Sequence, residues 1–293
     1  MMGGSILITD QGPLVSVLMA SFNHVKYVVD AINSVVNQTY KNIELIVIDD
    51  GSTDGTAEKV ANLAKLHGFT FLQQENIGYQ RTLMKLNALA TGKYISPFAS
   101  DDLYEPTKIE KLVHFLETNP QYAAVHSKIC IIDSDGVKQH VINEPCRSGN
   151  VFGELLRGDF RINGISALVR TDVYQSVVRH DDYVDDLPIW LAVARKHEIA
   201  FYNEVTARYR VHNNHLSSNV SRMMESELAI LSRYVDSPYY SDAASALYLR
   251  WFWVLAATNK VEAVKRLLSI GNLPAIVLKT TFYKGMFRLL FRW

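Results

Sequence analysis

The stretch over residues 14–56 constrains the fold more than any other, because it holds two apolar runs of strand length with a helical pattern between them. The first run, VSVLMA, ends in small and polar residues, and the second, IELIVI, ends at Asp49 and Asp50. Between them, with Asn23 as a candidate N-cap, the apolar residues that line one face of a helix are Val25, Val28, Val29, Ile32, Val35 and Val36. The pattern predicts a β-α-β unit with two carboxylates at the C-terminal edge of its second strand, where parallel sheets bind ligands.

Strand and helix patterns keep alternating well beyond this unit, which predicts an α/β fold with a mostly parallel central sheet and flanking helices. Near Asn219 the character changes, and the remaining segments are helical patterns with little strand content. We therefore expect an α/β domain over residues 1–218 and a helical C-terminal region over residues 219–293.

Composition excludes several classes of protein. The formal net charge is zero, so no overall field favours nucleic acid as a partner. The two cysteines, Cys130 and Cys146, lack the spacing of a zinc site or a disulfide framework, which fits a reduced cytosol. Residues 1–11 do not have the pattern of a signal peptide, and no apolar run is long enough to span a membrane. We expect a cytoplasmic protein.

Three blocks, VSVLMASFN, NQTY and ELIVIDDGSTDGT, resemble in that order the opening of the inverting family-2 glycosyltransferases, and shorter blocks continue to about residue 217. The resemblance implies a GT-A fold, Rossmann-like with a mostly parallel sheet. It also implies transfer of a sugar, with inversion, from a nucleotide-diphosphate donor, UDP-sugar favoured. The acceptor would be a hydroxyl of a glycan or lipid-linked acceptor in cell-surface polysaccharide biosynthesis.

The same resemblance assigns donor-binding residues. Asp50 would accept a hydrogen bond from a base N–H, Phe22 would stack under the base, and Ala20 would supply a backbone contact. Arg81 would approach the base or the phosphates. From the residues alone, a solvated turn acid, a core aromatic and a surface helix residue remain open for Asp50, Phe22 and Arg81.

Metal binding is expected where ASDD follows an apolar run, at the position of the family's DxD motif. Asp101 would hold Mn²⁺ or Mg²⁺ against the pyrophosphate, with Asp102 beside it. Ala99 replaces the first acid that relatives commonly carry, so a ribose or metal contact there is absent or supplied otherwise. The block YRVH resembles one that closes the family's catalytic part, and its His212 would complete the metal shell. A helix-capping role for the acids and a structural role for the histidine are the alternatives.

The catalytic base is expected in the block YVDDLPIW, which resembles the family's Glu-Asp-x-x-x-Trp block with Asp185 in place of Glu. Inverting displacement needs a carboxylate that takes the proton of the acceptor hydroxyl, and we assign Asp186 to this role. Because Asp181 and Asp182 also lie here, an acidic loop without catalytic function is the alternative.

Other classes of protein share part of these features. Receiver-type phosphoacceptor domains also carry paired acids at a strand end, but they are about half as long and lack the later acid clusters. A catalytically weakened scaffold is suggested only by Ala99. Among enzymes, a polyprenyl-phosphate sugar synthase is the second candidate.

The C-terminal segment combines aromatic and basic residues. In helical projection one side of the last helix carries Phe282, Met286, Leu289, Leu290 and Trp293, and another carries Lys284, Arg288 and Arg292. This composition is typical of a helix lying on an anionic membrane surface, here the inner face of the cytoplasmic membrane. Packing against the α/β domain or a second subunit is the alternative.

Overall fold

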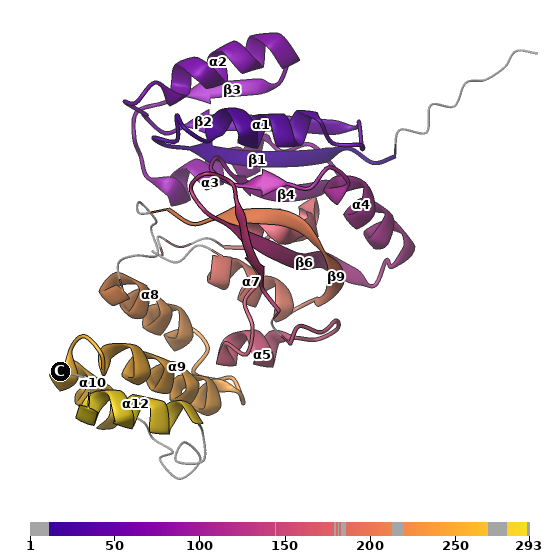
Figure 1. The fold of residues 1–293 in the computed structure, drawn as a ribbon. Helices are drawn as coiled ribbons and strands as arrows, with labels where there is room; N and C mark the ends of the chain where they lie inside the picture. Colours follow the sequence, from indigo (N-terminus) through magenta and orange to yellow (C-terminus); the bar gives the residue numbers. More distant parts are fainter. Residues whose placement is uncertain are drawn as a thin grey trace, which may run out of the picture.

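The computed structural model describes residues 12–143, 145–178, 180, 182, 186–212, 220–268 and 280–291. In these parts of the chain, a nine-stranded mixed sheet has helices on both faces (Figure 1). The strands are β1 (Val15–Ser21), β2 (Ile43–Asp49), β3 (Thr70–Gln73), β4 (Tyr94–Ala99), β5 (Leu103–Tyr104), β6 (Tyr122–Ile132), β7 (Lys138–Val141), β8 (Ala167–Arg170) and β9 (Glu198–Arg210). The helices are α1 (Val28–Val36), α2 (Thr56–His67), α3 (Tyr79–Leu89), α4 (Lys108–Thr118), α5 (Phe152–Arg157), η1 (Gly164–Ser166), α6 (Thr171–Gln175), α7 (Asp186–Ala194), α8 (Val220–Ser232), α9 (Tyr240–Leu255), α10 (Lys260–Leu268) and α12 (Thr280–Phe291).

The strand order is β3-β2-β1-β4-β8-β6-β9-β5, with β7 paired to β6. The first four strands in this order, up to β4, pair in parallel, as the β-α-β pattern predicts. The second half also contains antiparallel pairs, because β8 lies antiparallel between β4 and β6, and β5 and β7 add two more. The strands β6 and β9 pair in parallel over most of their length. The strand β9 is long and runs without a break from Glu198 to Arg210.

Strand β1 is buried at every position, because both faces of the sheet are covered. Val17 and Met19 belong to the core shared with α1, α2 and α4. The alternate residues Leu18 and Ala20 belong to the core on the other face, shared with α3, α5 and α7. The continuous apolar run that identifies this strand in the sequence therefore follows from burial on two sides.

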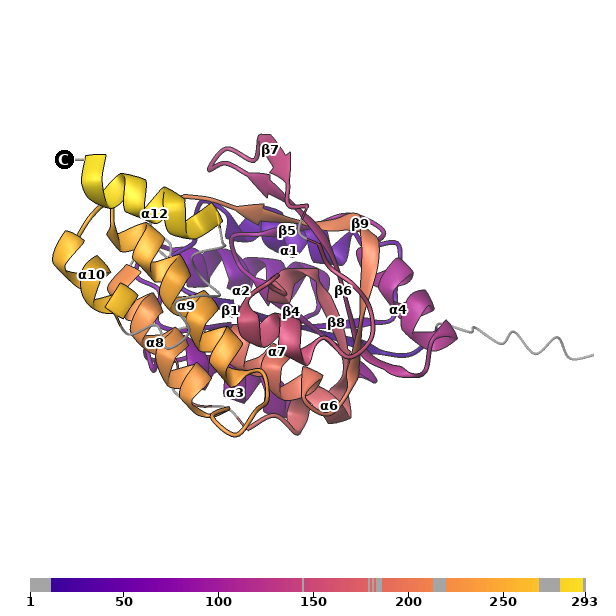
Figure 2. The same cartoon turned by 90° about the horizontal axis from the view of Figure 1, so that it is seen from below.

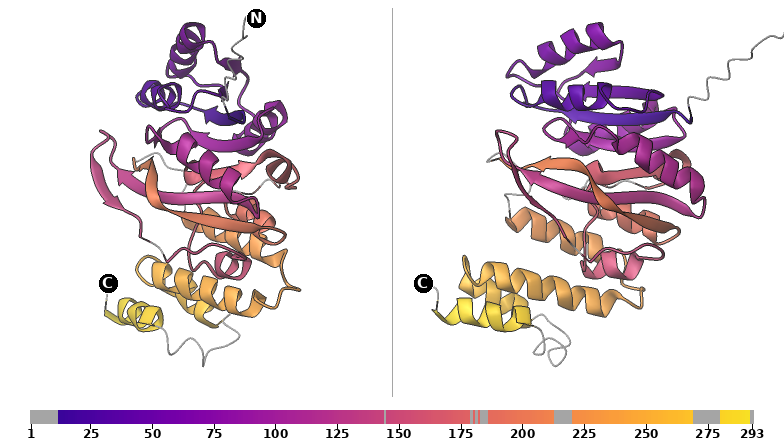
Figure 3. Two further views of the ribbon diagram at one scale, coloured as in Figure 1. Left: turned by 90° about the vertical axis from the view of Figure 1, so that its right-hand side faces the viewer. Right: turned by 45° about the vertical axis from the view of Figure 1, so that its right-hand side comes forward.

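The C-terminal helices gather at one end of the molecule, away from α2 and β3 (Figures 1 and 3), and Figure 2 shows them from that end. Helix α9 packs against α5, α8, α10 and α12. Its residues Leu247 and Phe252 belong to the same hydrophobic core as Leu18 in the sheet. The domain boundary predicted near Asn219 falls at residues 213–219, outside the described part of the chain.

The face of helix α12 that is exposed to solvent is not the apolar side that the helical projection selects. Phe282, Met286 and Leu289 pack inward against the core. Tyr283 and Phe287 are exposed instead, with fractional exposures of 58% and 62%. Packing on α9 decides this orientation, since the ring of Phe252 lies close to the backbone of α12. Arg292 and Trp293 lie outside the described residues.

The start of α1 also differs from the prediction. Its N-cap is Tyr27, and Asn23 has a left-handed backbone with φ of 52°. The Asn23 side chain accepts a hydrogen bond from the Thr53 amide, so it joins two loops and does not cap the helix. Among the described residues, no helix has the length and apolar character needed to cross a membrane.

Candidate active site

Three strands end at the same level of the sheet and bring their following loops together. Ala20 near the end of β1 pairs with Ile48 of β2 on one side and with Ala99 of β4 on the other. The loops that follow carry three of the motifs that the sequence singled out. This is the C-terminal edge of the parallel strands, where the β-α-β pattern predicts ligand binding.

Asp50 is buried, and its carboxylate is held by donors from within the chain. Gln74 Nε2 and the Ile77 amide donate to its Oδ1 at 2.8 and 3.0 Å, and the Gly78 amide donates to its Oδ2 at 3.0 Å. The carboxylate therefore fastens the loop before α3 to the end of β2.

The other residues assigned to the donor lie around the same edge. Phe22 follows β1 with 45% of its surface exposed, so its ring is accessible to a ligand. Ala20 is buried within β1. Arg81 is exposed in the first turn of α3, just beyond the loop that Asp50 holds.

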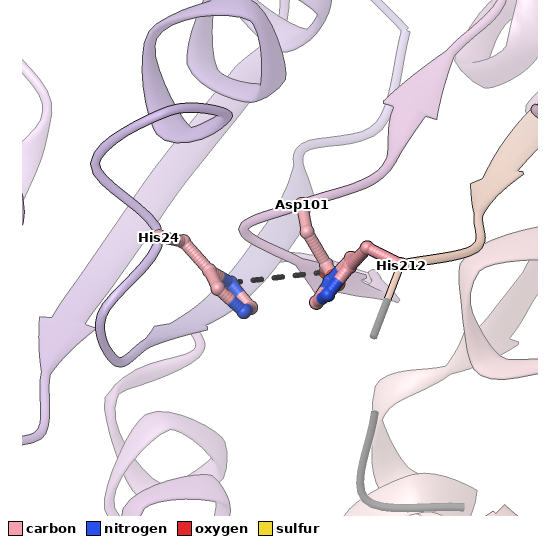
Figure 4. A group of neighbouring side chains, drawn as sticks. All are labelled: His24, Asp101 and His212. Carbon is pink, nitrogen blue, oxygen red and sulfur yellow. Dashed lines mark hydrogen bonds and ion pairs between the residues drawn. The ribbon is translucent and has the colours of Figure 1, made fainter. Parts of the chain in front are cut away.

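Asp101 forms the centre of a group of possible metal ligands (Figure 4). His212 Nε2 lies 3.0 Å from Asp101 Oδ2, and His24 Nδ1 lies 3.9 Å from Asp101 Oδ1. One ligand atom from each residue lies within 4.8 Å of the others. Two ligands about 2.1 Å from one ion are separated by roughly 3.0 to 4.2 Å. The separations of 3.0 and 3.9 Å from the Asp101 oxygens fall in this range, so the carboxylate and two imidazoles are candidate ligands of a divalent metal ion.

The surrounding side chains hold this group in place. The ring of His212 stacks on Tyr27, with centroids 5.2 Å apart. The Arg210 guanidinium lies 4.7 Å from the centre of the Tyr27 ring and donates to the Asp101 carbonyl oxygen at 2.7 Å. Burial lowers the pKa of His24, which keeps its imidazole in the neutral form that binds metals.

Asp102 points away from the metal-ligand group, although it is the neighbour of Asp101 in the chain. It is buried, and its Oδ1 accepts a hydrogen bond from the Arg210 amide at 2.7 Å. Burial, followed by the negative charge of Asp101, raises the pKa of Asp102 well above its usual range. In this arrangement Asp102 ties the turn after β4 to the end of β9.

Asp186 begins α7 and reaches the same edge of the sheet. The Gly164 amide donates to its Oδ2 at 2.9 Å. A Cβ atom at Gly164 would lie 2.7 Å from Asp186 Oδ1, so a side chain at this position would displace the carboxylate. The charge of Asp186 is near enough to contribute to the raised pKa of Asp102. Asp181 and Asp185 lie outside the described residues.

Sequence reasoning did not identify His24 as a site residue. It follows the strand–turn block SFN directly, and its position beside Ser100, with His24 Nδ1 2.8 Å from Ser100 Oγ, depends on how two distant loops meet. The signal available in the sequence was indirect. Ala99 leaves one acid fewer after β4, which made a ligand from elsewhere in the chain plausible.

The profile of glycosyl transferase family 2 matches residues 16–177. An uncharacterized glycosyltransferase of Haemophilus influenzae is 32% identical over 221 residues, which is 70% of this chain and 68% of that protein. A putative teichuronic acid biosynthesis glycosyltransferase, TuaG of Bacillus subtilis, is 29% identical over 217 residues, 72% of this chain and 84% of that protein. The chain spans about a third of the length of three longer rickettsial relatives that it also matches.

Two solved structures share the fold at low sequence identity. TarS 1-349 of S. aureus, in complex with UDP-GlcNAc, superposes with a TM-score of 0.62 and 15% identity, over 93% of this chain and 79% of that one. The mannosyltransferase PcManGT of Pyrobaculum calidifontis, in complex with GDP-Man and Mn²⁺, gives 0.60 and 17% identity, over 94% and 85%. These similarities concern the fold.

Proposed function

Because the chain belongs to glycosyl transferase family 2 and has the GT-A fold, we propose that it transfers a sugar from a nucleotide-diphosphate donor to a hydroxyl acceptor with inversion. A UDP-sugar is the favoured donor, and a glycan or lipid-linked acceptor in cell-surface polysaccharide synthesis is the favoured acceptor. The UDP-GlcNAc and GDP-Man bound in the TarS and PcManGT structures support a nucleotide-diphosphate sugar as the donor. The relative named for teichuronic acid biosynthesis supports an acceptor in cell-surface polysaccharide synthesis.

One observation carries the proposal: Asp186 and the His24–Asp101–His212 group lie at the same edge of the sheet. Metal-assisted sugar transfer needs a base near the acceptor and a cation near the departing diphosphate. The Gly164 amide fixes one oxygen of the Asp186 carboxylate. In this proposal the carboxylate takes the proton of the acceptor hydroxyl as the hydroxyl attacks the anomeric carbon.

The donor would lie across the loops after β1, β2 and β4. Phe22 offers an exposed ring for the base, and Arg81 offers a positive charge beside the loop that Asp50 holds. A divalent ion at His24, Asp101 and His212 would neutralise charge on the leaving diphosphate. The Mn²⁺ in the PcManGT complex supports a metal of this kind.

A panel of nucleotides tests the donor assignment. At a hundred times its dissociation constant, a ligand stabilises the folded protein by about 2.7 kcal/mol. For a chain of this size this corresponds to a rise in Tm of about 5 to 11 °C. We expect that shift with one nucleotide diphosphate and Mn²⁺, and sugar transfer from the matching donor.

The products separate the related possibilities. A product that extracts into organic solvent without further glycan would identify a polyprenyl-phosphate sugar synthase. Binding of the donor without hydrolysis or transfer, with or without Mn²⁺, would identify a scaffold.

We also propose that the C-terminal helices bind an anionic membrane surface, which would place the enzyme at the inner face of the cytoplasmic membrane. Support comes from the outward face of α12, where Tyr283, Phe287 and Leu290 are exposed next to Lys284. Aromatic rings at headgroup depth, with cations toward anionic lipid, stabilise such contacts.

Flotation with vesicles tests this surface. Replacing Tyr283 and Phe287 with serine should abolish flotation with anionic vesicles at low salt. Leu66→Ser is the matched control, because Leu66 is 73% exposed on α2 at the opposite end of the molecule (Figure 1). Unchanged binding of the double variant, or binding that ignores lipid charge, would reject the proposal.

A further inference from the structure

The metal-ligand group draws on three segments that are far apart in the chain. His24 lies in the turn between β1 and α1, Asp101 follows β4, and His212 follows β9. Their side chains are largely shielded from solvent, with exposures of 23%, 14% and 8% respectively. Three ligands from one shielded group can hold an ion more tightly than the Asp101 carboxylate alone.

Protein contacts hold the three ligand residues in place. A hydrogen bond between His24 Nδ1 and Ser100 Oγ, 2.8 Å long, orients one imidazole, and a metal ion bound at Nδ1 would replace this hydrogen bond. Stacking on Tyr27 orients the other, that of His212. The Asp101 backbone is held by the Arg210 guanidinium. Because these side chains are ordered by protein contacts, binding an ion costs little further conformational entropy.

Other acids near the group are engaged elsewhere. Asp102 accepts from the Arg210 amide, and Asp54 accepts from the amides of Val25 and Thr56. Ala99 offers no ligand atom. Among the described residues, His24 is therefore the side chain placed to add a third protein ligand to Asp101 and His212.

We propose that His24 is a ligand of the catalytic metal ion, and that the resulting two-histidine, one-carboxylate set binds Mn²⁺-type ions in preference to Mg²⁺ before any nucleotide arrives. Imidazole nitrogen suits transition metals, whereas Mg²⁺ prefers oxygen ligands and gives up its water shell reluctantly. Only the description of the ion as catalytic rests on the function proposed above. The binding itself is measured without a sugar donor.

The test uses the full chain without nucleotide. Mn²⁺ is titrated in, and the unbound ion is followed by electron paramagnetic resonance. We expect about one tight Mn²⁺ per chain, and little displacement by a roughly tenfold excess of Mg²⁺. His24→Gln should weaken Mn²⁺ binding at least about tenfold, since even outer contacts of metal ligands contribute that much. His114→Ala, on the exposed surface of α4, is the matched control and should bind as the wild type does.

Electron spin echo envelope modulation distinguishes direct binding of the metal ion by His24 from a purely structural role of this residue. Bound Mn²⁺ in the wild type should show coupling to nitrogens of two histidines, and the His24→Gln variant should show one. Unchanged nitrogen coupling or unchanged affinity in that variant would overturn the assignment of His24, and equal competition by Mg²⁺ would overturn the selectivity. If His24→Gln does not fold, His24→Asn serves for the same comparison. Failure of sugar transfer with every donor, together with the expected metal binding, would reject the proposed function and leave the metal site standing.

Discussion

Replacing Asp186 with asparagine separates the proposed chemistry from the structural role of this side chain. Asparagine has nearly the same shape, and its side-chain oxygen can still accept the hydrogen bond that the Gly164 amide donates at 2.9 Å. The substitution removes the negative charge and with it the ability to take a proton. Donor binding and folding should therefore change little, while turnover falls.

The sizes of the two effects differ enough to be distinguished. A hydrogen bond to a charged acceptor contributes about 1 kcal/mol more than one to a neutral acceptor. Loss of a carboxylate from the first turn of α7 removes about 0.3–1 kcal/mol of favourable interaction with the helix dipole. The structural cost is thus about 1 to 2 kcal/mol. Loss of a general base lowers turnover by a factor of about 10² to 10⁴, which is about 2.7 to 5.5 kcal/mol in the barrier.

The assay compares kcat, KM and donor affinity in Asp186→Asn and in the wild type, with Tm measured alongside. Asp172→Asn is the matched control, because Asp172 is an exposed acid in the first turn of α6. We expect kcat to fall by at least about 10² with donor affinity retained, and the control to lose only a little stability. Turnover like that of the wild type in Asp186→Asn, or a parallel loss of donor binding and kcat, would refute the assignment of the base.

Two further predictions concern buried charges. Lys108 is fully buried, and burial lowers its pKa well below the usual range. The unfolded chain therefore binds more protons below pH of about 10.4, so wild-type stability should rise with pH by up to about 1.4 kcal/mol per unit. Lys108→Met has no buried amine to protonate, so its free energy of unfolding should exceed that of the wild type. In urea titrations this difference should decrease between pH 7 and 9.5, and a difference independent of pH would contradict the prediction. Glu227 accepts hydrogen bonds from Arg161, Arg250 and Trp251, so Glu227→Ala should cost about 3 to 5 kcal/mol and Glu227→Gln clearly less, whereas equal costs in urea unfolding would show that its charge and oxygen acceptors matter little.

The sequence by itself determined the elements whose pattern is local. The apolar runs of β1 and β2 and the helical periodicity between them predict the parallel half of the sheet, and the structure confirms it. Gly68 follows the helical pattern of α2 directly and ends the helix in the left-handed conformation with φ of 75°, as glycine commonly does. These features depend on residues within a few positions of one another, and side-chain spacing along the chain is sufficient to reveal them.

Neighbouring residues with the same chemistry show what the sequence could not decide. Asp101 and Asp102 are adjacent acids, yet one faces two histidines and the other is buried against the Arg210 amide. No local pattern distinguishes them, because each direction is set by a partner more than a hundred positions away. The same holds for Asp50, whose carboxylate is occupied by the loop before α3.

Helix α12 gives the third example. Helical projection correctly finds an apolar side on α12, but only packing on α9 decides that Phe282 and Met286 face inward and that Phe287 faces out. His24 joins the metal-ligand group for the same kind of reason, since the loops after β1, β4 and β9 meet only in the folded sheet. Periodicity in the sequence shows which residues share one side of a helix or strand. Long-range packing decides which other element covers that side. The candidate site consists of residues that such packing brings together.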